Sequence, residues 1–499
     1  MDQKRGRANI VSDIVAAIER GEVVGIEGAV ERIDTHLNHV FLAGKRAYKI
    51  KRDRKLPFVD FSTLSKRRSA CEAEVRINRS LGSPFYLGVF GIIRRGDRYV
   101  LEATEEALEW VVVMTRFDTH QRFDRLLEND GIDLEMLQAT ARMISAMHAR
   151  APVIRNLGHA ADYLQIVNGL RRTEQEGASE LGLSACTPIY DQLVAALRKL
   201  DRLIEHRRAQ GRVRRVHGDL HLANLCMFEG KPTAFDALEF DPRLATTDVL
   251  HDLAFLLMDL IHANRKREAN TVMNSYWDEA QESEDSLRLL PFFMALRAAV
   301  RLAVAVPDGR LEHAASYRDL ALYLLQNSVP KAIAIGGLSG TGKSSLAREV
   351  APMLPGSAGA RILRTDVIRK QVRSIAPETP AAASAYTTDQ RMLIYERMVR
   401  QAREAASAGA SIVLDATFQD EDARKLMDTG LARTQRFWLE APLETRLARI
   451  GARTADASDA SARVAIAQEH GATSPSDWVR LDARLPVEQL ARRLVEHLA

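Results

Sequence analysis

Apolar residues form short, strand-like stretches in the first part of the chain and longer helical patterns after them. Residues 22 to about 117 predict a β-rich region with one inserted helix at Arg67–Leu81. The expected strands are Val23–Ile26, His39–Leu42, Ala47–Ile50, Tyr99–Leu101 and Trp110–Met114. From Phe123 onward the expected helices are Asp133–Ala149, Thr187–Arg208, Asp248–Asn264 and Pro291–Val306. Residues 1–328 are therefore predicted to form one domain, with a β-rich lobe (about 22–117) and a helical lobe (about 118–328).

The pattern changes near Lys331. Pro330 follows the helical stretch Ala314–Gln326, and the domain boundary is expected at 327–330. The 171 residues from Val329 to the end suffice for a small α/β domain. Its expected strands are Ala332–Ile335, Ala360–Arg364, Ser411–Asp415 and Phe437–Leu439.

Composition narrows the class of protein. The 499 residues are 46% hydrophobic and 27% charged, as is usual for a soluble globular protein. A net charge of +4 is compatible with anionic substrates such as ATP and does not demand nucleic acid. Cys71, Cys186 and Cys226 have no spacing typical of a disulfide framework or a zinc site, so a cytoplasmic location is expected. The longest apolar runs contain charged residues, so no membrane segment is expected.

The run from Gly337 to Ser344 fits the phosphate-loop pattern G-x-x-x-x-G-K-[ST], between an expected strand and an expected helix. Glycines let the backbone N–H groups face phosphate, Lys343 would reach the β- and γ-phosphates, and the Ser344 hydroxyl would hold Mg²⁺. The expected nucleotide-binding residues here are Gly337, Ser339, Gly340, Thr341, Gly342, Lys343, Ser344 and Ser345.

A second dense motif runs from His217 through Gly218 and Asp219 to Asn224, and Asp236 follows twelve residues later. Asp219 could accept the proton of an attacking hydroxyl, while Asn224 and Asp236 offer the oxygen ligands that Mg²⁺ prefers. Two short strands between them predict a hairpin that brings Asn224 and Asp236 together. His217 is expected to shape the loop by hydrogen bonding.

This motif resembles the aminoglycoside phosphotransferase family, a branch of the protein-kinase-like fold, over most of residues 22–328. The resemblance implies Asp219 as catalytic base and Asn224 and Asp236 as magnesium ligands. It also implies a strand lysine paired with a helical glutamate: Lys49, with Lys51 as the alternative, and Glu74, with Glu72 as the alternative. Residues 150–215 show no acidic cluster that would demand an aminoglycoside, so antibiotic modification is not supported. Asp248 and Asp252 look like the family's structural acids, or they simply complement a helix dipole.

Acids end two strands of the second domain. Asp366 follows the strand at Ala360–Arg364 and is expected to activate an acceptor hydroxyl or to cap a helix, and Arg369 could hold an acceptor anion. Asp415 ends a buried strand and is expected to help fix Mg²⁺. Arg449 and Arg453 lie four residues apart in a predicted lid at about 446–465, where they could reach a phosphoryl group, or they belong to a solvated helix.

Residues 331–495 resemble predicted P-loop kinases related to gluconate kinase, zeta toxins and the polynucleotide kinase 5′-hydroxyl domain. The predicted fold is thus an α+β two-lobed protein-kinase-like domain followed by an α/β P-loop domain with a parallel sheet. The predicted function is a bifunctional kinase that uses ATP and Mg²⁺ on sugar- or polyol-like small molecules. The alternatives are a nucleic-acid 5′-hydroxyl kinase and a module that binds nucleotide to regulate the other.

Overall fold

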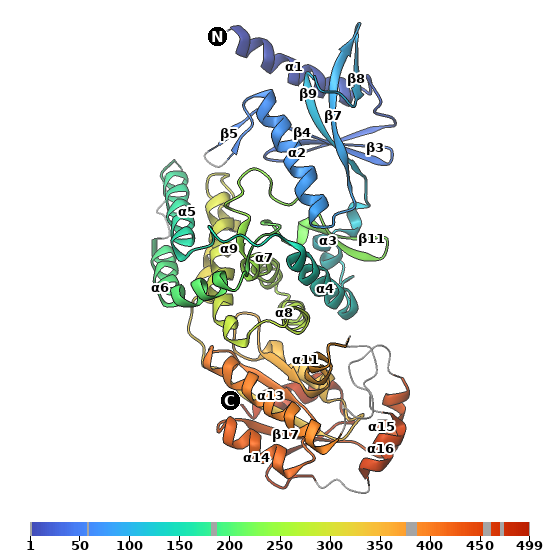
Figure 1. Ribbon diagram of the computed structural model, residues 1–499, viewed down its shortest axis with the longest axis vertical. Helices are drawn as coiled ribbons and strands as arrows, with labels where there is room; N and C mark the ends of the chain where they lie inside the picture. The colour runs from blue at the N-terminus through green and yellow to red at the C-terminus, as the bar shows by residue number, and fades with distance from the viewer. Residues whose placement is uncertain are drawn as a thin grey trace. The chain divides into compact units, whose positions relative to one another are not determined.

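The computed structural model describes residues 2–56, 59–180, 187–375, 387–452, 461–469 and 474–498. The chain divides into two compact units. The first comprises Met1–Tyr163 and Asp201–Leu256, and the second comprises Leu164–Leu200 and Leu257–Ala499. Figure 1 colours the elements of both units by residue number. The predicted boundary at 328 is a division by sequence motif and stays a prediction.

A seven-stranded sheet organises the start of the first unit, in the order β1-β8-β7-β9-β4-β3-β2. Its strands are β1 (Val23–Val24), β2 (Val30–Asp34), β3 (Asn38–Ala43), β4 (Arg46–Lys51), β7 (Tyr86–Arg95), β8 (Arg98–Glu102) and β9 (Glu109–Thr115). The short pair β5 (Lys55–Leu56) and β6 (Val59–Asp60) lies outside this sheet. The helices of this region are α1 (Asp2–Glu19) and α2 (Leu64–Ser80).

Alternation along the central strand β9 explains how the two helices are placed. Val111 and Val113 join the apolar cluster that contains Ile14 of α1. Val112 and Met114 point to the opposite face, into the cluster that contains Val75 of α2. Because successive side chains of a strand face opposite sides, the all-apolar stretch buries both faces of the sheet.

The rest of the first unit carries helices and two small two-stranded sheets. Its helices include α3 (Phe123–Glu128) and α4 (Leu134–Arg150), and Asp133 caps α4 by accepting from the Met136 amide. The short strands pair as β10 (Val213–Arg215) with β13 (Thr246–Asp248), and β11 (Leu225–Phe228) with β12 (Lys231–Ala234). Three helices contribute residues to both units: α5 (Ala160–Glu180), α6 (Thr187–Ala209) and α7 (Val249–His262).

A five-stranded sheet organises the second unit, in the order β15-β16-β14-β17-β18, and all its neighbours are parallel. Its strands are β14 (Ala332–Gly337), β15 (Arg361–Arg364), β16 (Ile412–Asp415), β17 (Gln435–Glu440) and β18 (Val479–Asp482). The helices that follow these strands are α11 (Lys343–Val350), α12 (Thr365–Val372), α13 (Thr388–Ser407), α14 (Glu421–Gly430), α15 (Leu443–Gly451), α16 (Ala462–Glu469) and α17 (Val487–Glu496). The predicted α+β region followed by a domain with a parallel sheet is confirmed.

The second unit also contains α8 (Lys266–Ala280), α9 (Leu290–Ala305) and α10 (Leu311–Leu324). The sequence pattern did not predict α8, whose buried face includes Asn270 and Asn274 in place of apolar side chains. It also did not predict β7, where Gly91 interrupts the alternation. A Cβ at Gly91 would lie 2.5 Å from Thr104 and 2.6 Å from Ala107, so the close packing of β7 requires glycine there.

The structure also bears on the predictions about membrane spans and cysteines. Among the described residues, none of the helices combines the length and the apolar character that a membrane span requires. Cys71 and Cys226 are both buried free thiols, and Cys186 lies outside the described residues. Burial raises the pKa of both thiols to about 12. The cytoplasmic location stays a prediction.

Candidate active sites

The β11–β12 hairpin brings the two predicted magnesium ligands of the first unit together. Leu225 pairs with Ala234 at the open end of the hairpin, so Asn224 just precedes β11 and Asp236 lies two residues beyond β12. The Phe235 amide donates to the Asn224 carbonyl at 3.1 Å. Asp236 has a left-handed backbone with φ +63°, and its amide donates to the Tyr86 hydroxyl at 3.0 Å. Such backbone geometry in a non-glycine residue costs free energy and often marks a functional position.

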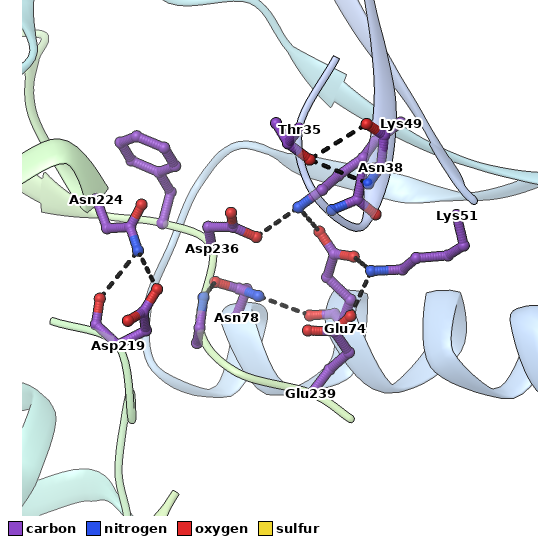
Figure 2. A network of polar contacts seen from close by, with 12 residues as sticks. Thr35, Asn38, Lys49, Lys51, Glu74, Asn78, Asp219, Asn224, Asp236 and Glu239 are labelled. Carbon is purple, nitrogen blue, oxygen red and sulfur yellow. Dashed lines mark hydrogen bonds and ion pairs between the residues drawn. The ribbon is translucent and has the colours of Figure 1, made fainter. Parts of the chain in front are cut away.

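Asp219 lies beside Asn224 (Figure 2). The Asn224 Nδ2 donates to Asp219 Oδ2 at 3.0 Å and to the Asp219 carbonyl at 2.9 Å. This leaves Asn224 Oδ1 as the amide atom available to a cation. The Asp219 carboxylate is 37% exposed, so a substrate hydroxyl can approach it.

A buried acid holds the loop that carries Asp219. Asp252 accepts hydrogen bonds from the Gly218 amide at 2.8 Å and from the His217 amide at 3.3 Å. Gly218 has φ +83°, and a Cβ there would lie 2.6 Å from Ala245, so only glycine fits. His217 Nε2 donates to the Phe235 carbonyl at 2.9 Å, and burial lowers the pKa of this imidazole. Both His217 and Asp252 therefore shape the loop.

The two predicted lysines both contact the same glutamate. Lys49 and Lys51 project from one face of β4, and the carboxylate of Glu74 on α2 lies between them (Figure 2). Lys49 Nζ lies 2.9 Å from Glu74 Oε1 and also binds Asp236. Glu72 lies on the outer face of α2 and binds Arg68 at 2.8 Å. The geometry thus distinguishes Glu74 from Glu72, but it engages both lysines.

Lys51 extends this chain of charges to Glu239, a residue that the sequence reasoning missed. Burial opposes the charge on Lys49 and Lys51, but the neighbouring carboxylates outweigh it, so the pKa of each ammonium is raised. Burial also opposes ionisation of Glu74, yet the two ammonium groups hold its pKa well below the ordinary value. The pKa of Glu239 is raised by burial. The two ammonium groups thus lie among three carboxyl groups, those of Glu74, Asp236 and Glu239, and such a surplus of acidic groups suits a nearby cation.

The phosphate-loop motif of the second unit lies between β14 and α11. Gly340 and Gly342 have φ +85° and +96°, and Gly342 is the N-cap residue of α11. A Cβ at Gly340 would lie 2.7 Å from the Arg446 carbonyl, and one at Gly337 would lie 2.7 Å from the Leu439 carbonyl. Ser339 and Thr341 are buried in the loop, whereas Ser345 is exposed on α11. The loop thus ends at a helix N-terminus, where backbone N–H groups favour an anion.

Ser344 and Asp415 meet at the start of this helix. The Ser344 hydroxyl donates to Asp415 Oδ2 at 2.6 Å. Asp415 ends β16, the strand next to β14, and its register partner there is Ile335. Arg364, at the end of β15, also binds the Asp415 carboxylate at 3.2 Å. Lys343 Nζ donates to the Leu338 carbonyl at 2.9 Å, which keeps the ammonium at the loop.

Asp366 lies in the first turn of α12, whose N-cap residue is Arg364. It is therefore the second residue of the helix and not its cap. Its carboxylate accepts from Arg369 at 2.6 Å and is 32% exposed. This ion pair orients Asp366 and occupies Arg369, the residue expected to hold an acceptor anion.

The predicted lid arginines are placed differently from one another. Arg449 donates to the Thr341 carbonyl at 3.0 Å and to the Ala483 carbonyl at 2.7 Å, so it braces the phosphate loop from α15. Arg453 lies outside the described residues, as does part of the predicted lid. Arg446, which the sequence reasoning missed, is fully buried and binds Glu469 of α16. From the same helix, Gln468 Oε1 accepts from the Ser339 amide at 2.9 Å.

Two protein-family models match separate parts of the chain. Residues 97–290 match the model of a phosphotransferase enzyme family, and residues 333–475 match that of an AAA domain. The chain joins a phosphotransferase-family domain to a P-loop domain. This confirms the predicted pairing and supports a phosphotransferase of the kinase type that uses ATP.

Similar chains were also found. An uncharacterized protein of Mycobacterium tuberculosis is 29% identical over 482 residues, covering 91% of this chain and 93% of that protein. A sugar kinase from Janibacter is 22% identical with a TM-score of 0.28, covering 34% of this chain and 94% of its own. A choline kinase from Cryptosporidium parvum is 12% identical with a TM-score of 0.42, covering 63% of this chain and 95% of its own.

Proposed function

We propose that this chain is an ATP-dependent kinase with two phosphate-transfer sites, one in each matched domain. The observation that supports the proposal is that each unit, by itself, brings together side chains of the kinds that kinases use to handle a nucleotide. In the first unit these are Lys49, Glu74, Asp219, Asn224 and Asp236. In the second they are the phosphate loop with Lys343, the Ser344–Asp415 pair and Asp366.

In the first site, Asp219 is the catalytic base. Its carboxylate takes the proton of the acceptor hydroxyl, the oxygen bonds to the γ-phosphorus, and the bond to the β–γ bridging oxygen breaks to release ADP. Asn224 holds the Asp219 carboxylate in place through its Nδ2. Lys49, oriented by Glu74, neutralises phosphate charge.

In the second site, the backbone amides of the phosphate loop and Lys343 hold the β- and γ-phosphates. Asp366 accepts the proton of the acceptor hydroxyl, because it is partly exposed beyond the carboxyl end of β15. Arg449 supports the loop through the Thr341 carbonyl. Its predicted contact with a phosphoryl group requires a change of partner.

The residues present fit magnesium at both sites. Asn224 Oδ1 and the Asp236 carboxylate, which is 41% exposed, would hold it in the first, and the Ser344 hydroxyl with Asp415 would hold it in the second. These are the hard oxygen donors that Mg²⁺ prefers, and the ion would neutralise charge that develops on the transferring phosphoryl group.

A sugar or similar polyol is the acceptor class that we propose for both sites, from the resemblance to gluconate kinase and the phosphotransferase family. A kinase of nucleic-acid 5′-hydroxyl ends is the second candidate for the P-loop domain. It draws on the resemblance of the Asp366 and Arg369 spacing to that family, but Arg369 is engaged by Asp366. A regulatory role for one nucleotide-binding module is the third.

The test is a mass-spectrometric screen of phosphate acceptors with the full chain and two variants, Asp219→Ala and Lys343→Ala. Two active sites predict that each variant loses a different set of phosphorylated products. If either variant loses every product, the two sites do not act independently, and the regulatory candidate gains support. Transfer to a 5′-hydroxyl oligonucleotide that disappears in Lys343→Ala would favour the nucleic-acid kinase.

A further inference from the structure

One edge of the parallel sheet in the second unit is covered by the side chains of a helix. β15 is the edge strand, and β16 pairs with it on one side. On the other side lies α8, which carries Asn270 and Asn274 one helical turn apart. Unpaired backbone groups at a sheet edge must find partners when they are buried.

The two asparagines supply those partners. Asn270 Nδ2 donates to the carbonyls of Ala358 and Ala360 at 2.7 and 2.9 Å. Asn274 Nδ2 donates to the Ala360 carbonyl at 3.1 Å, and its Oδ1 accepts from the Ile362 amide at 2.7 Å. Asn274 thus binds a backbone donor of β15 and the backbone acceptor just before it, as a neighbouring strand would.

A buried arginine completes this contact. The Arg361 guanidinium, at the start of β15, binds Asp278 at 2.7 Å, Glu284 at 3.1 Å and Asn274 Oδ1 at 3.2 Å. Burial opposes its charge, but Asp278 and Glu284 outweigh that effect and raise the pKa of Arg361. The Glu284 carboxylate is also buried, whereas the Asp278 side chain is 26% exposed, so separating Arg361 from Glu284 would leave two unpaired buried charges.

The contact continues from the strand into the candidate site. β15 leads directly into α12, which carries Asp366. Gln371, near the end of α12, donates to the Asp278 carbonyl at 2.9 Å. The segment that bears Asp366 is therefore tied to α8 both before and after that residue. The phosphate loop, in contrast, follows β14 at the centre of the sheet.

We propose that α8 positions the acceptor side of the P-loop site, with Asn274 and Arg361 as positioning residues for Asp366. The inference rests on the proposed role of Asp366. It also means that α8, which lies before the predicted boundary at 328, belongs functionally to the P-loop domain.

The test uses the full chain with Asp219→Ala, so that ATP turnover reports on the P-loop site alone. Into this background we introduce Asn274→Ala, and as a control Arg267→Ala, which removes an exposed side chain of α8 that binds Glu349 at 2.7 Å. Three quantities are measured: hydrogen exchange of residues 335–350 and 361–372, affinity for a fluorescent ATP analogue, and the kcat and KM of ATP hydrolysis.

Asn274→Ala is expected to speed exchange in residues 361–372 by about tenfold, with no change in 335–350. The affinity for the ATP analogue stays within about twofold while kcat falls about tenfold, and Arg267→Ala changes none of these. A uniform loss of protection in both segments, or none in 361–372, would overturn the inference. If Asn274→Ala fails to fold, Asp278→Asn, which keeps the side-chain shape, is measured in its place.

The exchange measurement also separates the two proposals. If the Asp219→Ala protein hydrolyses no ATP, the proposed activity of the P-loop site fails. Exchange in 361–372 then still decides whether α8 holds the segment that bears Asp366.

Discussion

The two candidate sites differ in whether side chains or backbone groups form them. The first depends on side chains from distant parts of the sequence, brought together as a chain of ion pairs: Lys49, Glu74 and Asp236 span almost two hundred positions. The second depends on one contiguous loop whose backbone makes the anion site, with Ser344 and Asp415 added from neighbouring elements. The positions of charged side chains should therefore determine activity and stability at the first site, and backbone geometry should determine nucleotide affinity at the second.

The largest difference between the two sites is expected from a substitution at Asp219. Asp219→Asn keeps the shape of the side chain but removes its ability to accept a proton, so the products of the first site should form about 10³-fold more slowly. Products of the P-loop site should be unchanged, which serves as the internal control. Both are followed by mass spectrometry, and an equal loss of the two product sets would contradict independent sites.

The next effect concerns stability in the first unit. Glu74→Gln removes the carboxylate that binds both buried lysines and should lower the free energy of unfolding by about 3 kcal/mol, since each buried ammonium loses one of its carboxylate partners. Glu72→Gln, on the exposed face of the same helix, is the matched control and should change it by less than about 1 kcal/mol. Denaturant unfolding measures both free energies. Equal effects would show that the buried ion pairs of Glu74 stabilise the fold no more than an exposed ion pair does.

Acid provides a second readout on Glu74. The pKa of its carboxyl falls from an ordinary value of 4.5 to about 2, because the two ammonium groups outweigh the effect of burial. The stabilisation is then fully present above pH 4.5 and is lost as the pH falls towards 2. The difference in unfolding free energy between the wild type and Glu74→Gln should shrink over that window. A difference that stays constant from pH 6 to pH 3 would disprove this account.

A smaller effect is expected on nucleotide affinity at the P-loop site. Lys343→Ala should weaken binding of a fluorescent ATP analogue at this site by about 100-fold, since it removes a charged hydrogen bond to phosphate. The analogue is titrated into Asp219→Ala protein, and its displacement by ATP is followed separately at each site. Lys425→Ala removes an equally positive but exposed side chain on α14, bound to Glu421 at 2.8 Å, and is the control. Similar losses from both variants would indicate a general effect of charge.

The same contrast explains which parts could be predicted from the sequence. The phosphate loop is contiguous, so its residues, the strand before it and the helix after it were all predicted. The hairpin between Asn224 and Asp236 was predicted because its strands are adjacent in sequence. For the lysine, alternation along β4 places Lys49 and Lys51 on one face, and both bind Glu74, so the alternatives reflect a real property of the strand.

What the sequence did not reveal depends on tertiary contacts. Glu239 follows Asp236, a proposed magnesium ligand, by three residues, but its contact with Lys51 needs the fold of both lobes. The complete burial of Arg446 arises from packing against α16 and cannot be recognised in an arginine-rich helix. In α8 the buried side chains of Asn270 and Asn274 bind backbone groups at a sheet edge. The buried face of the helix is therefore partly polar, and it lacks the apolar periodicity from which helices are predicted.

The smallest predicted effect separates the hydroxyl of Ser344 from the backbone around it. Ser344→Ala removes the donor to Asp415 and a candidate metal ligand, yet leaves the loop glycines and Lys343 in place. If the backbone carries most of the binding, the affinity for the ATP analogue should fall by only about tenfold. Ser344→Thr restores the hydroxyl and should recover most of that loss. A loss as large as that of Lys343→Ala, or no recovery with threonine, would mean that side-chain charge and packing govern this site as they do the first.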